Sequence, residues 1–161
     1  MNIFVLDVCQ KSCAQQHIDK HVVKMPLETA QMLCTAITCH GGPARYKVVH
    51  KNHPCTIWTR ETRTNFIWLV NLGKELCEEY SYRYGKVHKC LEVIEDCEAK
   101  SGYIPEGGLT PFAQAMPQEF KRDNPIDAYR AYYIGAKFGF ASWKLRVKPE
   151  WFVFKEDEEL T

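Results

Sequence analysis

Polar side chains that could do chemistry recur at three-to-four spacing in one segment near the start of the chain. They are His17, Lys20, His21, Lys24 and Glu28. In an α-helix this spacing places the side chains on one face. Histidine titrates near neutral pH, a lysine amine can form a Schiff base, and a carboxylate can take up a proton. The segment predicts a site that binds an anion and moves protons, although a solvated charged face shows the same pattern.

A metal site is an alternative interpretation of the same segment. Cys9, Cys13, His17 and His21 follow one another at four-residue steps, and the two histidines could hold one ion from adjacent turns. However, four ligands on a single helix cannot surround an ion tetrahedrally, and no second ligand pair has zinc-finger spacing. We therefore predict no metal and no cofactor.

Three further segments combine basic and aromatic residues, which is typical of surfaces that hold phosphates and stack on bases. They run over residues 50–60, 78–88 and 129–146. Each also has an ordinary interpretation, as a polar loop, a helical ion pair or core aromatics. The candidates for binding nucleic acid or phosphate are Lys51, Asn52, His53, Arg60, Arg83, Lys86, Arg130 and Lys137, and the candidates for stacking are Trp58, Tyr82 and Tyr133.

The charges are distributed in blocks, although the net charge is only +1. Residues 11–60 carry seven basic and two acidic residues, and residues 119–148 carry seven basic and three acidic ones. Residues 75–106 between them carry eight acidic and four basic residues. Two basic segments could fold into one face that attracts DNA or a nucleotide phosphate. An ordinary mixed surface remains the alternative.

Length and composition bound the fold. A chain of 161 residues, 45% of them hydrophobic, fits one domain with a full core. No apolar run is long enough to span a bilayer, and the apolar start is too short for a secretory signal. We expect a soluble protein of the cytoplasm, whose eight cysteines are mostly reduced, buried thiols.

The apolar periodicity predicts mainly helices. Residues 2–7 should form a strand or an extended arm on the core, and a helix should begin near Ser12 and be kinked or divided at Pro26. Further helices are expected over about 56–84, 86–100 and 125–143, with a long loop over 101–117. The prediction is a compact, mainly α, single-domain bundle of about four helices over residues 1–154, with a frayed acidic tail over 155–161.

Two stretches resemble the phage pyrimidine-dimer DNA glycosylases of the endonuclease V type. One is Ala14-Gln15-Gln16-His17, which leads through a helix to Met25-Pro26. The other is Met116-Pro117-Gln118-Glu119-Phe120-Lys121, followed by a helix and the aromatic end Pro149-Glu150-Trp151-Phe152. The chain length and the order of these parts also agree. The whole chain is similar, too, to a group of uncharacterised phage proteins, which supplies no activity.

This resemblance implies a helical enzyme that flips a base out of the duplex. Its nucleophile would be the α-amino group at the chain start, and its acid would be a glutamate in the first helix. That glutamate corresponds to about Lys24 here, and Glu28 lies one turn further on. The start, Met1-Asn2, lacks the expected small first residue, and a bulky second residue usually leaves the methionine in place.

The leading hypothesis is therefore a phage-type enzyme that repairs or modifies a DNA base in the host cytoplasm. Lys20 or Lys24 would stabilise an anion or form a Schiff base, Glu28 would be the carboxylate, and His17 and His21 would carry protons. One alternative is a transferase or hydrolase that binds nucleotide phosphates. Another is a non-catalytic phage protein that sequesters a nucleotide signal or blocks a host protein.

Overall fold

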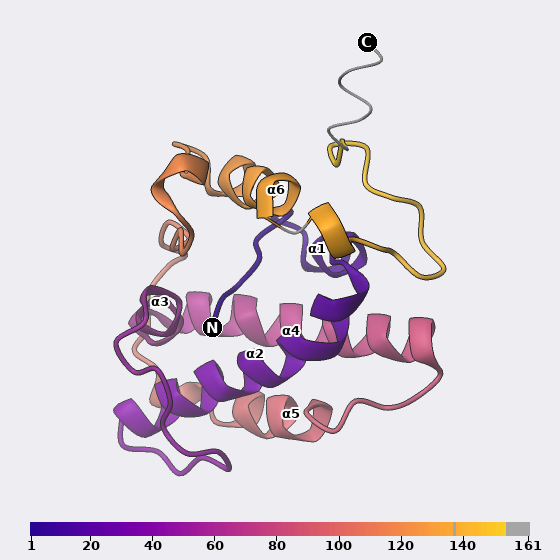
Figure 1. Ribbon diagram of the computed structural model, residues 1–161. Coiled ribbons are helices and arrows are strands. Elements are labelled where there is room, and N and C mark those ends of the chain that lie inside the picture. The colour runs from indigo at the N-terminus through magenta and orange to yellow at the C-terminus, as the bar shows by residue number, and fades with distance from the viewer. Residues whose placement is uncertain (137, 154–161) are drawn as a thin grey trace.

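A computed structural model describes residues 1–136 and 138–153, and its centre is helix α4 (Arg63–Tyr84). Thr62 caps the start of α4 by accepting a hydrogen bond from the Asn65 amide, and Gly85 ends it with a φ of 67°. A left-handed φ favours glycine, so the predicted stop at Gly85 is confirmed. Four helices pack on α4: α1 (Gln10–Gln16), α2 (Asp19–Cys39), α3 (Pro54–Glu61) and α5 (Leu91–Ala99). Figure 1 shows α2 and α4 crossing, with α5 below them.

Helix α2 is buried along much of its length. The apolar spacing of this segment predicts that one face packs on the core, and the residues on it are all buried: Ile18 at the N-cap and Val22, Met25, Thr29, Met32 and Leu33 within the helix. Of the two predicted effects of Pro26, a kink or a division, the division is excluded, because Pro26 lies inside this 21-residue helix. The chain instead breaks at His17 and Ile18, where the Asp19 amide donates to the Ser142 carbonyl at 2.8 Å. The C-terminal segment thus satisfies a backbone donor at the start of α2.

The two central helices approach closely at Gly73. A Cβ atom there would lie 2.8 Å from the Thr29 methyl group on α2 and 3.0 Å from Ile94 on α5. No real side chain tolerates such contacts without displacing its neighbours. Glycine at this position therefore sets how deeply α2 packs against α4, and it places the residues that α2 carries.

The N-terminal residues form an extended arm, as one of the two predicted alternatives requires. Residues 3–6 are buried, and no strand is assigned among the described residues. The Phe4 carbonyl accepts from the Cys13 thiol at 3.2 Å, and the Leu6 carbonyl accepts from Arg130 Nε at 2.9 Å. In Figure 1 the arm runs from the N-terminus, in the middle of the molecule, towards α1 and α6. Its first residue therefore lies where several helices meet.

The described residues contain six α-helices instead of about four, although the mainly α class is confirmed. The predicted helix over 56–84 is two helices, because Thr62 adopts an extended conformation between α3 and α4. The helix predicted over 86–100 begins only at Leu91. The last helix, α6 (Pro125–Ala136), is shorter than predicted but has the expected cap, since Asn124 Oδ1 accepts from the Ile126 amide at 2.9 Å. Short 3-10 turns lie at Ser101–Tyr103, Gln118–Phe120 and Phe138–Phe140.

The aromatic end of the chain folds back on the body. Phe152 is fully buried, and the Trp143 and Trp151 indoles donate to the backbone and the side chain of Gln16 at 2.8 and 2.9 Å. Phe154 and the predicted tail over 155–161 lie outside the described residues. Six of the eight cysteines are buried free thiols, as expected for core cysteines. Among the helices that the structure describes, none has the length and hydropathy of a membrane span.

Candidate functional site

The start of the chain meets Glu28 on α2. The α-amino nitrogen of Met1 lies 3.2 Å from Glu28 Oε1, and the Asn2 amide donates to the same oxygen at 3.0 Å. Lys24 Nζ lies 3.8 Å from the other oxygen, Oε2. Glu28 is buried, whereas the Lys24 side chain is 71% exposed. We call Met1, Lys24 and Glu28 the amine–carboxylate site. It places a primary amine directly beside a buried carboxylate.

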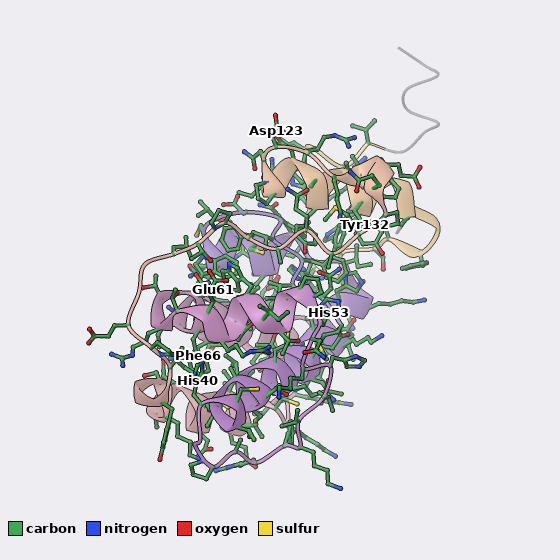
Figure 2. The ribbon with its side chains drawn as sticks, turned by 90° about the vertical axis from the view of Figure 1, so that its left-hand side faces the viewer. His40, His53, Glu61, Phe66, Asp123 and Tyr132 are labelled. Atoms are coloured by element: carbon green, nitrogen blue, oxygen red, sulfur yellow. The ribbon has the colours of Figure 1, made fainter. Side chains whose placement is uncertain are left out.

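The loop before α3 ends at His53. His53 caps α3, because its Nδ1 accepts from the Cys55 amide at 3.1 Å. Burial lowers the pKa of His53, the positive Met1 amine and His50 lower it further, and Glu28 opposes them. The pKa of His53 therefore lies below that of an ordinary histidine. In Figure 2 the labels His53 and Glu61 mark the two ends of α3.

The five polar residues predicted to share one helix face, which we call the polar stripe, do not lie on one face of one helix. They are His17, Lys20, His21, Lys24 and Glu28. His17 lies at the break before α2 and is fully buried, and its Nδ1 bonds to the Cys13 carbonyl at 2.7 Å. The His21 ring stacks on Phe4 at 4.2 Å, and its Nδ1 lies 2.6 Å from the Tyr133 hydroxyl. Lys20 and Lys24 are instead exposed, and the Lys20 ammonium lies over the Phe140 ring at 4.4 Å from its centre. The expectation of a shared face is wrong, because the helix breaks after His17 and α2 buries His21 beside Val22 and Met25.

The buried His17 predicts a loss of stability in acid. Burial lowers its pKa from 6.5 to about 4, because Nε2 has no partner and a proton there would be stranded. Between these pH values the unfolded chain binds a proton that the folded chain does not, so stability falls as the pH drops. The expected loss for this group is about 3 kcal/mol between pH 7 and pH 4. Urea unfolding across this range should give a shallower pH slope for His17→Asn. An unchanged slope would contradict the assignment.

Arg83 was predicted to bind phosphate, and its burial contradicts this. Its Nη1 donates to the His17 carbonyl at 2.8 Å and lies 3.0 Å from Asp19. Its Nη2 donates to the Gln15 carbonyl and to Glu79, both at 3.0 Å. Arg83 is only 2% exposed, so a phosphate cannot reach it. The side chain instead joins α4 to the break between α1 and α2.

Two of the three predicted stacking residues are also buried. Trp58 packs between Trp68 and Phe112, and Tyr133 is fully enclosed beside His21. Both were predicted to stack on bases and cannot, because no face of either ring is open. Tyr82 is 51% exposed, but its ring lies under Arg146, whose guanidinium carbon is 4.1 Å from the ring centre.

Tyr82 also lines a groove that is ill suited to nucleic acid. The groove has a volume of about 560 Å³ and is lined by Glu75, Glu78, Glu79 and Glu95, with Lys11, Lys74 and Arg146 at its walls. Four carboxylates disfavour the approach of a phosphate backbone. This face of α4 is therefore a poor candidate for the DNA surface.

The other predicted binding residues are distributed as follows. Lys51 and Asn52 are exposed in the loop that ends at His53, and Lys86 is exposed after α4. Arg60 donates to the Lys51 carbonyl, and Arg130 is partly buried against the arm and Asp7. Lys137 lies outside the described residues. Among the described residues, no cluster of three or more His, Cys, Asp and Glu side chains could hold a metal ion.

Sequence reasoning missed two residues that hold the start of the arm in place: Asn2 in the arm itself and Tyr129 on α6. Asn2 donates through Nδ2 to the Ala115 carbonyl at 2.8 Å, and its Oδ1 lies 2.9 Å from the Tyr129 hydroxyl. A lone polar residue before the apolar run at residues 3–6 was the one available signal for Asn2. Tyr129 gave none, because it stands in an aromatic helix like any core residue.

Comparison with known proteins identifies a family. A family model for the pyrimidine dimer DNA glycosylases matches residues 1–93, a span that contains the arm, α1 to α4 and the amine–carboxylate site. No curated protein and no solved structure matches the chain. The match covers more than half of the 161 residues. The chain therefore belongs to the pyrimidine dimer DNA glycosylase family.

Proposed function

We propose that this protein removes a damaged pyrimidine from DNA, with the Met1 amine as nucleophile and Glu28 as its proton acceptor. The observation that carries the proposal is the 3.2 Å contact between the Met1 nitrogen and Glu28 Oε1. A nucleophilic amine needs an adjacent base, and this carboxylate is both adjacent and shielded from solvent.

The bond changes follow from this pair. The amine gives a proton to Glu28 and attacks C1′ of the deoxyribose, so that a C–N bond forms. The bond from C1′ to the base breaks, and the base leaves with the bonding electrons and takes up a proton. Glu28 then gives its proton to the ring oxygen O4′ as the C1′–O4′ bond breaks, so the sugar ring opens, an imine forms between Met1 and C1′, and Glu28 is again a carboxylate. Glu28 is placed to accept the C2′ proton in a following strand cleavage, in which the 3′ phosphate leaves.

Lys24 fits a different role from the Schiff-base amine considered from the sequence. Its ammonium lies 3.8 Å from Glu28 and its side chain is 71% exposed. An exposed ammonium is a strongly hydrated point charge that suits a phosphate. We assign Lys24, with Lys20 and the loop residues Lys51 and Asn52, to the DNA backbone around the amine.

The two histidines of the polar stripe, His17 and His21, lie beside the N-terminal arm. His21 stacks on Phe4 of the arm, and His17 lies near the same ring, at 6.2 Å between ring centres. Since both are buried, we propose that they hold the arm and do not carry protons to the substrate.

The test is incision of ultraviolet-irradiated duplex DNA, with the unirradiated duplex as control. The expected result is strand breaks, after mild alkali, only in the irradiated duplex. Absence of both breaks and released base would overturn the proposal. A thermal shift with free nucleotides in the same preparation would then favour the nucleotide-binding alternative.

A further inference from the structure

A buried hydroxyl lies at the centre of the contacts that hold the first residues of the arm. Tyr129, on α6, is fully buried, and its hydroxyl lies 2.9 Å from Asn2 Oδ1 and 2.7 Å from the Ala113 carbonyl. The same oxygen accepts from the Ala115 amide at 3.2 Å, and the Cys55 sulfur lies 3.9 Å away. The hydroxyl therefore joins the arm, α3, α6 and the loop before α6.

Asn2 uses its backbone amide and both polar atoms of its side chain in this arrangement. Its Nδ2 donates to the Ala115 carbonyl, and its Oδ1 accepts from the Ile3 amide at 2.8 Å as well as from Tyr129. Its backbone amide donates to Glu28 Oε1, the oxygen that also holds the Met1 nitrogen. The two nitrogens are separated by one residue of chain. The position of Asn2 therefore sets where the Met1 amine points.

We propose that Tyr129 and Asn2 are positioning residues, which fix the Met1 amine against Glu28 without touching the DNA. This inference rests on the proposed function. Oriented reactants gain much of their rate from geometry, and a misplacement of about 1 Å can cost about 100-fold. Burial of Tyr129 keeps it away from solvent and from a bound duplex.

The phenol has a single proton for two nearby acceptors, Asn2 Oδ1 and the Ala113 carbonyl. Burial raises its pKa well above its ordinary value, so the hydroxyl stays protonated and keeps this bond. Removal of the hydroxyl leaves the Ala115 amide without its acceptor and Asn2 without one donor. The arm then gains freedom at its first two residues, whereas the buried run over residues 3–6 keeps its packing.

The test is Tyr129→Phe in the full chain, measured on a duplex with one abasic site. In single-turnover borohydride trapping, the rate of imine formation should fall about 10- to 100-fold. The dissociation constant for the duplex should stay within about twofold, because the hydroxyl contacts no DNA. A second variant, Asn2→Asp, removes the Nδ2 donor, keeps a bulky second residue and should show the same split between rate and binding.

Tyr46→Phe is the matched control, because it removes a tyrosine hydroxyl that contacts Cys90 away from the arm. It should trap at the wild-type rate. Wild-type trapping rates in both Tyr129→Phe and Asn2→Asp would overturn the inference, as would an equal loss of duplex affinity. If the wild-type protein forms no adduct, the proposed function fails instead, so the two failures can be told apart.

Discussion

Glu28→Gln is expected to lower the rate of base release about 1,000-fold. The glutamine keeps the size of the side chain and its hydrogen-bond acceptor, but it cannot take a proton from the Met1 amine. General acid–base groups contribute about 100- to 10,000-fold to enzyme rates, and this carboxylate is assigned to both amine activation and proton removal from the sugar. The measurement is the single-turnover rate at which an irradiated duplex gains sites that mild alkali cleaves, at saturating enzyme.

Two checks accompany this variant. Glu61→Gln removes an exposed glutamate at the far end of α3 (Figure 2) and should retain the wild-type rate. A thermal melt should show that Glu28→Gln is folded, because the Asn2 amide still has an oxygen to bond. Release within about tenfold of wild type would show that Glu28 is not the proton acceptor, since general acid–base catalysis contributes at least about 100-fold.

Extension of the N-terminus by two residues is expected to abolish covalent trapping. Each added residue moves the free amine by up to about 3.5 Å, and the nitrogen of Met1 becomes an amide that is not nucleophilic. The Met1 nitrogen now lies 3.2 Å from Glu28, so the added residues have to leave this position. Trapping on an abasic duplex should therefore fall to the level of a blank reaction.

The same two residues added after Thr161 are the control for this experiment. They leave the amine unchanged and should leave trapping unchanged. Strong trapping by the N-terminally extended protein would mean that a lysine forms the imine. In that case Lys24, whose ammonium lies near Oε2 of Glu28, becomes the first candidate for the residue that forms the imine.

The buried residues of this fold could be predicted from the apolar periodicity. The positions at which its helices are interrupted could not. Ile18, Val22 and Met25 are buried as their spacing predicts. Pro26 is the strongest local breaker, but packing against α4 outweighs it. The real break at His17 depends on partners distant in sequence, the Ser142 carbonyl and Arg83. Local propensity contains no information on such contacts.

The candidate site, too, could be predicted only in part. The sequence pointed to Glu28, and the resemblance pointed to the α-amine. Their 3.2 Å contact could not be predicted, because it depends on where the arm crosses α2. Arg83 and Tyr133 look like nucleic-acid-binding residues in the sequence, yet both are buried. Residue type alone does not distinguish an arginine that binds a phosphate from a buried arginine that bonds to backbone carbonyls where a helix is interrupted.

The most direct test of the central claim is to locate the covalent adduct. Wild-type protein and Lys24→Gln would each be trapped with borohydride on an abasic duplex, digested and mapped by mass spectrometry. An intact mass measured beforehand establishes that the chain starts at Met1. The account predicts that both proteins carry the reduced sugar on the α-nitrogen of Met1. An adduct on Lys20 or Lys24 would contradict the account, and so would loss of the adduct in Lys24→Gln.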